Sequence, residues 1–475
     1  MPKYIWKSIS DLADDVKSGK TTATELVEKS LELIEENEEF KPIIAVIKDG
    51  SLKRAKEIDS AIKSGKKVGR LAGVPFIAKD NFLVYGADTT AASNILKGFD
   101  APYQSTAINK LEAEGAICVA KANLDAFAHG SSTENSDFFT TLNPHDKTRV
   151  PGGSSGGSAA SVALSLAPFS LGSDTGGSIR QPASFCGVVG LKPTYGIVGR
   201  SGVVAMGSSL DVIGPIAKNV EDAATVLDVI SGKDGLDMTM IDRDKESYSK
   251  LDKTIKGKKI GLIKEYMDES VDPEVIKVIK ESVDKLVASG AIVEEVSLPL
   301  SKLGLPAYYI LCPAEVSSNL SRYDGQRYGY SYKDAKDLSE SYMLSRDVGF
   351  GDEAKRRIMI GTYVLSSGYY DAYYKKAQVV RTKIIEESDK AFSKFDFLVG
   401  PTTPTTAFKI GDKTGDPISM YLSDLMTVTA NLTGCPSMSI PAGEAQGLPV
   451  GIQIIAAQRK DRELLGFAKG FEELN

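Results

Sequence analysis

The feature that most limits how this chain can fold is an alternation of short apolar runs with amphipathic segments. Strand-like runs at residues 74–78, 116–120 and 169–171 alternate with helix-like segments at residues 105–114 and 157–166. The alternation resumes further along the chain, after residue 259. Such a pattern predicts an α/β fold with a layered core.

Signals near the two ends extend this pattern. Thr22 and Glu25 form a capping-box pattern ahead of apolar residues at helical spacing, which predicts a helix over residues 22–39. Residues 362–394, which include several tyrosines, are predicted as one long helix. Residues 450–455 are predicted as a strand, so the C-terminal part is expected to complete the same sheet.

The charge balance and the scarce residue types narrow the possible chemistry. The chain has 57 Lys and Arg against 63 Asp and Glu without a basic stripe, which argues against nucleic-acid binding as its main activity. Its four cysteines lie far apart without a CxxC pair, so buried thiols are predicted in place of a metal site. No apolar leader or run of membrane-spanning length is found, so we expect a cytoplasmic protein without membrane contact.

Two clusters rich in glycine and serine, at residues 151–158 and 172–178, are the most unusual stretches of the chain. Glycine at this density allows backbone N–H groups to converge where side chains would clash. A phosphate-binding loop is a competing interpretation, but neither cluster contains GxxxxGK[ST] or GxGxxG. A flexible linker is disfavoured because strand and helix signals flank both clusters. The clusters favour acyl transfer, which needs a nucleophilic hydroxyl and backbone donors facing the developing oxyanion.

Lys79 is the candidate base, because the chain has just two histidines to serve a Ser/His/Asp or Cys/His mechanism. It ends the apolar run at residues 73–78 and is expected to point from a buried strand into a cavity. Burial disfavours the charged form of a lysine and lowers its pKa, which is how a lysine can accept a proton near neutral pH. Taken alone, Lys79 would more often be a solvated residue at a strand end.

Residues 74–81 and the glycine and serine clusters through Ser178 resemble the amidase signature family, and the resemblance extends along most of the chain. It implies one large α/β/α sandwich with a mixed central sheet covered by helices. It also implies a single domain over residues 1–475, with an N-terminal helical segment at about 1–65 packing on the core, a catalytic core at about 66–216, and the remaining sheet and helices at 217–475.

The same resemblance implies the catalytic residues. Ser178 would be the nucleophile, and Ser154, held by a cis peptide bond, would relay its proton to Lys79. The backbone N–H groups expected to form the oxyanion hole are those of Thr175, Gly176 and Gly177.

Within the family, motifs at residues 121–125, 130–136, 187–196, 208–211, 356–363 and 368–378 resemble the amidase subunits of glutamyl-tRNA(Gln) amidotransferases. This resemblance implies that the chain hydrolyses glutamine, with Arg357 on its carboxylate, Asp424 on its amino group, and Gly130 and Ser131 beside it. The ammonia would serve partner subunits B and C, which use ATP and Mg²⁺ and make most of the contact with tRNA. No cofactor is expected in this chain, and whether glutamine tRNA, asparagine tRNA or both are served stays open.

The sequence departs from that pattern at Ala126 and His129, where these subunits generally carry glutamate and methionine. His129 is predicted to be a packed ring, although a polar role near the substrate stays open. The departure at Ala126 and His129 puts the substrate preference in doubt. It leaves the catalytic positions unaffected, because Lys79, Ser154 and Ser178 match the family pattern.

Other functions stay open. The chain could be a stand-alone amidase for small amides, with the same catalytic residues and a different pocket, or mainly a structural subunit of the tRNA complex. An N-terminal nucleophile would need an exposed Cys, Ser or Thr at the start, but residue 2 is Pro2, so we do not expect this mechanism. For a Cys/His/Glu mechanism Cys186 is the nearest candidate, and its neighbours indicate packing.

Overall fold

The computed structural model describes residues 4–475, so Met1, Pro2 and Lys3 of the predicted N-terminal segment lie outside the described residues. Within this range the strands form one 11-stranded sheet in the order β1-β3-β2-β4-β6-β5-β10-β11-β9-β7-β8. The strands are β1 Ile43–Val46, β2 Pro75–Lys79, β3 Ile117–Ala122, β4 Phe169–Asp174, β5 Val189–Lys192, β6 Val212–Ala217, β7 Lys259–Ile263, β8 Ile292–Val296, β9 Phe397–Pro401, β10 Ser437–Ala445 and β11 Leu448–Ala456.

The sheet is mixed. Strand β2 runs parallel to β3 and β4, and β7 runs parallel to β8 and β9. The other neighbouring pairs are antiparallel. The predicted α/β fold with a mixed central sheet is therefore confirmed.

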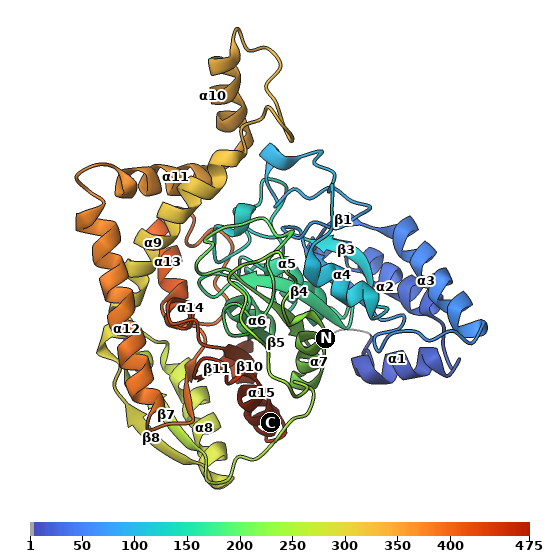
Figure 1. Ribbon diagram of the computed structural model, residues 1–475. Coiled ribbons are helices and arrows are strands. Elements are labelled where there is room, and N and C mark those ends of the chain that lie inside the picture. The colour runs from blue at the N-terminus through green and yellow to red at the C-terminus, as the bar shows by residue number, and fades with distance from the viewer. Residues whose placement is uncertain (1–3) are drawn as a thin grey trace.

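Helices cover this sheet, with α2 and α3 at its β1 end and α8 beside β7 and β8 at the other, while α10 projects from the body at the top of Figure 1. The helices are α1 Ile9–Lys17, α2 Ala23–Glu36, α3 Lys48–Lys63, α4 Thr106–Ala113, α5 Gly156–Ala163, α6 Arg180–Cys186, α7 Val220–Ile230, α8 Pro273–Ala288, α9 Gly304–Asn319, α10 Leu338–Gly349, α11 Asp352–Leu365, α12 Lys376–Phe392, α13 Pro417–Tyr421, α14 Val428–Leu432 and α15 Asp461–Glu472.

Burial explains why the central strands could be located from the sequence. Strands β2, β3, β4, β9 and β11 are buried along their whole length. A strand covered on both faces is a continuous apolar run, without the polar alternation of a half-exposed strand. Most side chains of β8, at the sheet edge, are by contrast exposed or half-buried.

The predicted features near the two ends have different outcomes. Helix α2 begins after Thr22, and both capping-box hydrogen bonds between Thr22 and Glu25 are present, which confirms that prediction. The predicted late strand is also confirmed, as β11 within the same sheet. The four cysteines are free and buried, as predicted.

The prediction of one helix over residues 362–394 is wrong. Helix α11 ends at Leu365 and α12 begins at Lys376, with a π-helical turn at Asp371–Lys375 before it. The backbone of Ser366 is extended, and Gly368 has a φ of 88°, a left-handed conformation that glycine adopts without steric cost. This break turns the chain at the left of Figure 1, so that α11 and α12 both pack on α9.

The parallel strands β2 and β4 position the candidate site. They are neighbours in the middle of the sheet, and Lys79 is the last residue of β2 while Ser173 and Asp174 end β4. The ends of parallel neighbours lie at the same edge of a sheet, so these residues meet there.

Candidate active site

Lys79 lies at the centre of a cluster of serines. Its Nζ is 2.8 Å from Ser154 Oγ, 2.9 Å from Ser155 Oγ and 3.1 Å from Ser173 Oγ, with the Ser173 carbonyl oxygen at 3.4 Å. The lysine side chain has no exposed surface. We call Lys79 and these three serines the lysine cluster.

Burial sets the charge of this lysine. It lowers the pKa of Lys79 from 10.5 to about 7, because the ammonium form loses its hydration, while the carboxylates of Asp125, Asp174 and Asp211 oppose the shift. A substantial fraction of Lys79 is therefore neutral near pH 7. A neutral amine at 2.8 Å can accept the proton of the Ser154 hydroxyl.

Ser154 and Ser178 come from the two glycine-rich clusters. The peptide bond between Gly153 and Ser154 is cis. The clusters are joined where the Ser155 N–H donates to the Ser178 carbonyl oxygen at 3.1 Å. This backbone hydrogen bond brings the loops of Ser154 and Ser178 together. The Ser178 hydroxyl itself makes no hydrogen bond to any residue from 4 to 475, so there is no direct bond between the two hydroxyls. Ser178 is 7% exposed, so the residue is not completely closed off.

The loop before Ser178 has free backbone donors, which an oxyanion hole would require. In the described part of the chain, the backbone N–H groups of Thr175, Gly176 and Gly177 donate to no protein acceptor. A Cβ atom on Gly176 would lie 2.7 Å from the Tyr308 ring, and one on Gly177 would lie 2.2 Å from Thr427 Oγ1. Glycine is thus needed at both positions for the backbone to approach this closely.

A buried ion pair holds this loop. Asp174 accepts two hydrogen bonds from Arg180, each at 3.0 Å, and one from Asn431 Nδ2 at 2.8 Å. Burial alone would raise the pKa of Asp174, but the Arg180 guanidinium brings it down to about 2. Arg180 also donates to the Thr427 carbonyl oxygen at 3.0 Å, and Thr427 Oγ1 donates to the Gly176 carbonyl oxygen at 2.5 Å. The loop is therefore fixed from both sides.

Arg357 lines a second place, a cavity of about 60 Å³ that we call the arginine pocket. Its lining includes Gly130, Ser131, Tyr309, Arg357 and Tyr421. Asp424 adjoins it by accepting hydrogen bonds from Ser131 Oγ at 2.9 Å and from the Tyr309 hydroxyl at 3.1 Å. The structure therefore brings together the four residues predicted to bind substrate.

Arg357 differs from an ordinary surface charge. It is 2% exposed, its Nε donates to Glu353 at 2.8 Å, and its guanidinium lies over the rings of Tyr309 and Tyr421. Its buried Nη1 has no hydrogen-bond partner among residues 4–475. A guanidinium with a free donor is suited to a carboxylate of a ligand.

Asp424 is also buried, with 7% of its surface exposed. Loss of hydration raises the pKa of its carboxyl to about 7, even though the hydrogen bonds from Ser131 and Tyr309 and the charge of Arg357 favour the ionised form. A ligand ammonium beside Asp424 would favour ionisation further, so binding of an amino group and ionisation are expected to be coupled.

Two side chains connect the arginine pocket to the glycine-rich loops. Gln181 donates to the Ser131 carbonyl oxygen at 3.0 Å and accepts from the Gly153 N–H at 2.8 Å. Thr427 Oγ1 contacts the carbonyl oxygens of Asp424 at 3.1 Å and Gly176 at 2.5 Å. A single side chain therefore bridges the arginine pocket and each glycine-rich loop: Gln181 for the loop of Ser154 and Thr427 for the loop of Ser178.

His129 is fully buried, with its ring 6.2 Å from that of Phe127. This agrees with the predicted packed ring, but neither ring nitrogen has a partner among the described residues. Burial lowers the pKa of His129 well below its usual value, and Arg357 lowers it further, so the ring is neutral. Ala126 is buried in the same loop.

Several residues with roles in this geometry were not predicted. Ser155 and Ser173 lie within the glycine-rich clusters, but the sequence did not indicate which serine side chains face Lys79. Asp125 belongs to one of the motifs named above, and its carboxylate accepts the N–H groups of Thr133 at 2.9 Å and Asn135 at 3.1 Å, which shapes the loop of Gly130 and Ser131. The sequence signal that could have indicated this loop is the density of Ser and Asn residues after Gly130, with Asp125 close before it.

A metal-binding group and a membrane-spanning helix were both searched for in the described residues. From residue 4 to residue 475 no group of three or more His, Cys, Asp and Glu is arranged to hold a metal ion. No helix in that range has the length and apolar character to cross a membrane.

Comparison with known proteins identifies the family. The amidase family model matches residues 25–465. The A subunit of the glutamyl-tRNA(Gln) amidotransferase of Macrococcus caseolyticus is 51% identical, covering 99% of this chain and 97% of that protein. The crystal structure of the corresponding A subunit from Thermotoga maritima is similar with a TM-score of 0.79 and 41% identity, over 95% of this chain and 91% of that one. A bacterial aryl acylamidase of the amidase signature family has a TM-score of 0.87 and 27% identity, over 99% and 96% of the two chains. The chain therefore belongs to the amidase family.

Proposed function

We propose that this chain is the glutamine-hydrolysing subunit of a tRNA-dependent amidotransferase, in which it supplies the ammonia that converts Glu-tRNA(Gln) to Gln-tRNA(Gln). The names of its relatives in Macrococcus caseolyticus and Thermotoga maritima support this assignment, and so does the chemistry of the arginine pocket. Asp-tRNA(Asn) is a possible second substrate of the complex, and the ammonia-release assay described below tests it when that tRNA is added.

The observation that carries the proposal is the presence of a buried guanidinium and a separate buried carboxylate near the loops of the candidate nucleophile. Arg357 offers a free Nη1 donor, and Asp424 offers a carboxylate. Gln181 and Thr427 connect their surroundings to the loops that contain Ser154 and Ser178. Free glutamine carries a carboxylate and an ammonium on one carbon and an amide at the far end. A simple amide has nothing for Arg357 and Asp424 to bind.

The proposed reaction has two stages. Neutral Lys79 takes a proton from Ser154 as Ser154 takes the proton of Ser178, and the Ser178 oxygen attacks the side-chain amide carbon of glutamine. The backbone N–H groups of residues 175–177 stabilise the oxyanion. The C–N bond breaks, the nitrogen receives the proton from the Lys79 side and leaves as ammonia, and a glutamyl ester remains on Ser178. Water then attacks the ester, glutamate leaves and the Ser178 hydroxyl is restored.

The proposal extends to the assembly. The chain works with partner subunits B and C, which use ATP and Mg²⁺ to activate the misacylated tRNA and which make most of the tRNA contact. This places it in the cytoplasm, where aminoacyl-tRNA is made. We further propose that residues 1–475 act as one domain, because β1, β4 and β9, from the three predicted segments, lie in one sheet.

The test is ammonia release from glutamine by the chain co-purified with its partners, compared with a panel of simple aryl and alkyl amides. We expect a preference for glutamine, stimulation by ATP and charged tRNA, and loss of release in Ser178→Ala. Ser158→Ala, which removes another buried hydroxyl whose hydrogen bond goes to the Leu171 carbonyl oxygen, is the matched control and keeps activity.

Two outcomes would contradict the proposal. A preference for simple amides, with no partner recovered, would make the chain a stand-alone amidase, as the likeness to the aryl acylamidase allows. Ammonia release by the complex that survives Ser178→Ala would leave the chain with a mainly structural role.

A further inference from the structure

The peptide unit between Gly176 and Gly177 sets the direction of the Gly177 N–H group. This peptide bond is trans, because within residues 4–475 the bond between Gly153 and Ser154 is the only cis bond. In a planar trans peptide the C=O and N–H groups point in opposite directions. An interaction that holds the Gly176 carbonyl oxygen therefore also fixes the direction of the Gly177 N–H.

Thr427 holds that carbonyl oxygen. Its Oγ1 lies 2.5 Å from the Gly176 carbonyl oxygen and 3.1 Å from the Asp424 carbonyl oxygen. A carbonyl can only accept, and two oxygens approach to about 2.5 Å only with a hydrogen between them, so the one hydrogen of the hydroxyl lies in the shorter contact. In the described part of the chain no other group donates to the Gly176 oxygen.

Thr427 is itself held by the backbone around it. The residue is fully buried, its N–H donates to the Asp424 carbonyl oxygen at 3.1 Å, and its carbonyl oxygen accepts from Arg180 Nη1 at 3.0 Å. A Cβ atom on Gly177 would lie 2.7 Å from the Cβ of Thr427, so the threonine side chain packs directly on the glycine backbone. The position of the hydroxyl is therefore well defined.

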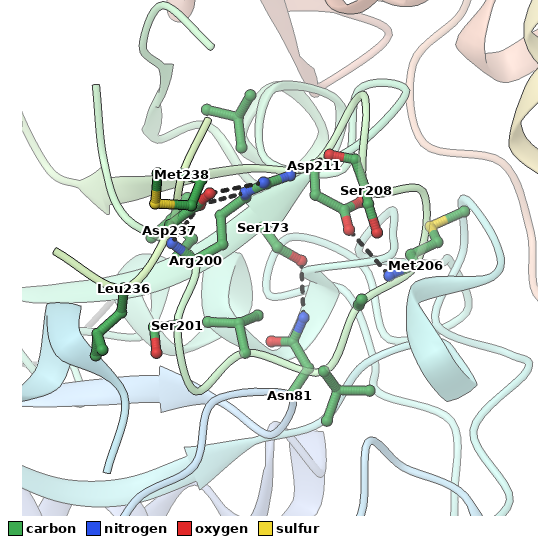
Figure 2. A pocket seen from close by; sticks show the side chains of 15 residues that line it. Asn81, Ser173, Arg200, Ser201, Met206, Ser208, Asp211, Leu236, Asp237 and Met238 are labelled. Carbon is green, nitrogen blue, oxygen red and sulfur yellow. Dashed lines mark hydrogen bonds and ion pairs between the residues drawn. The ribbon is translucent and has the colours of Figure 1, made fainter. Parts of the chain in front are cut away.

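The start of the loop has a separate anchor. Thr175 Oγ1 donates to Asp211 Oδ1 at 2.6 Å, and Asp211 also accepts from the Met206 N–H at 2.9 Å. Figure 2 shows Asp211 joined to Met206 in the wall of a cavity of about 260 Å³. This anchor acts on the side chain of Thr175, so the peptide unit after Gly176 depends on Thr427.

We infer that Thr427 is a positioning residue, whose hydroxyl holds the peptide unit between Gly176 and Gly177 so that the Gly177 N–H faces the developing oxyanion. The inference rests on the proposed function, since it concerns the same reaction at Ser178. Without the hydroxyl, the Gly176 carbonyl oxygen is left unpaired and the peptide unit can turn, which moves the N–H away from the oxyanion. Binding of glutamine by the arginine pocket does not use this hydroxyl, so the effect falls on kcat.

The experiment measures kcat and KM for glutamine hydrolysis by the reconstituted complex. Thr427→Val removes the hydroxyl at nearly constant volume, and we expect kcat to fall about tenfold to hundredfold with KM unchanged, because an oxyanion donor is misdirected. Thr427→Ser keeps the hydroxyl and should stay within a few-fold of wild type. Thr433→Val, which removes another buried hydroxyl that donates to the Thr429 carbonyl oxygen at 2.9 Å, is the matched control.

Inhibition by two ligands separates positioning from a structural role. The first is the analogue of glutamine in which a boronic acid group replaces the side-chain amide. Its boron accepts the Ser178 oxygen as a fourth ligand, the serine proton passes to Ser154 and Lys79, and the resulting tetrahedral anion resembles the oxyanion. The second is glutamate, which forms no such bond. For Thr427→Val we expect the inhibition constant of the boronic acid to rise by the factor by which kcat/KM falls, while that of glutamate stays unchanged.

An unchanged kcat in Thr427→Val, or a loss in Thr427→Ser as large as in Thr427→Val, would overturn the inference. Equal weakening of the boronic acid and of glutamate would also overturn it, because it would indicate a general distortion of the site. If Thr427→Val does not fold, Thr427→Cys supplies a weaker donor of similar size and should show a smaller loss of kcat, and wild-type kcat in that variant would count against the inference.

Failure of the proposed function would look different. Wild-type protein that releases no ammonia from glutamine would refute that function, and the Thr427 variants are then assayed on the amide that the protein does hydrolyse.

Discussion

The lysine cluster and the arginine pocket are both buried, yet they differ in whether their polar groups have hydrogen-bond partners. In the lysine cluster, Lys79 Nζ has three serine hydroxyl oxygens within 3.1 Å. Around the arginine pocket, Arg357 Nη1 and both ring nitrogens of His129 have no partner among residues 4–475. Unpaired buried polar groups are costly and uncommon in folded proteins. The difference indicates that the cluster is organised before substrate arrives, whereas the pocket leaves its donors for a ligand to satisfy.

The largest expected effect comes from breaking the organised region. Lys79→Met keeps the length and apolar stem of the side chain but removes the base, so we expect kcat to fall by about 10³- to 10⁴-fold with little change in KM. Steady-state ammonia release measures both constants. Lys218→Met, at another lysine whose ammonium donates to a backbone carbonyl oxygen, that of Ala163, should keep wild-type turnover.

Breaking the pocket should act on binding. Removal of the guanidinium in Arg357→Ala leaves the carboxylate of glutamine unpaired, so we expect kcat/KM for glutamine to fall by about 10²-fold, mainly through KM. Hydrolysis of a simple amide should stay within a few-fold of wild type. Lys355→Ala, on the same helix but paired with Asp347, is the control. An equal loss for glutamine and simple amides would mean that Arg357 has only a structural role.

The two regions also differ in what their titration changes. Lys79 must be neutral to act, and its pKa of about 7 predicts that kcat falls about tenfold per pH unit below 7. Asp424 must be ionised to hold an ammonium, and its pKa of about 7 predicts that KM for glutamine rises over the same range. Asp424→Asn should raise KM and abolish its pH dependence while the kcat profile persists. A kcat that is flat from about pH 5 to 8 would contradict the role of Lys79.

The smallest effect on activity is expected at His129. His129→Met replaces two unpartnered buried nitrogens with an apolar side chain, so the free energy of unfolding should rise by about 1 kcal/mol or more. We expect KM for glutamine to change less than about threefold, because the ring is neutral and packs against Phe127. Denaturant unfolding and steady-state kinetics measure the two quantities. A stability loss with a large rise in KM would show instead that His129 binds substrate.

Much of the fold could be predicted because the central strands are buried on both faces. The runs that became β2, β3 and β4 are apolar throughout, and Lys79 stands out as the charge that ends one of them. The helix break between α11 and α12 could not be predicted in the same way. The stretch has helix-forming residues on both sides, and the turn at Gly368 is stabilised by packing of both helices on α9, which local sequence does not encode.

The candidate site was predictable in its residues but not in its contacts. The glycine-rich loop indicated Ser178 with Gly176 and Gly177, and the family resemblance implied Ser154. The structure brings Ser154 within 2.8 Å of Lys79 and joins its loop to that of Ser178, while their catalytic roles stay predictions. The contact between Asn81 and Ser173 joins residues 92 positions apart in sequence, and it depends on how β2 and β4 align in the sheet. Such alignment follows from tertiary packing, so no local pattern could reveal it.

The most direct test of the account is to trap the covalent intermediate. The complex is mixed with glutamine, quenched in acid during turnover, digested and analysed by mass spectrometry. We predict a glutamyl ester on Ser178 in the wild-type protein and none in Ser178→Ala. A glutamyl adduct on another residue, such as Cys186, would contradict the account. So would full turnover of the wild-type protein without any adduct, together with activity retained by Ser178→Ala.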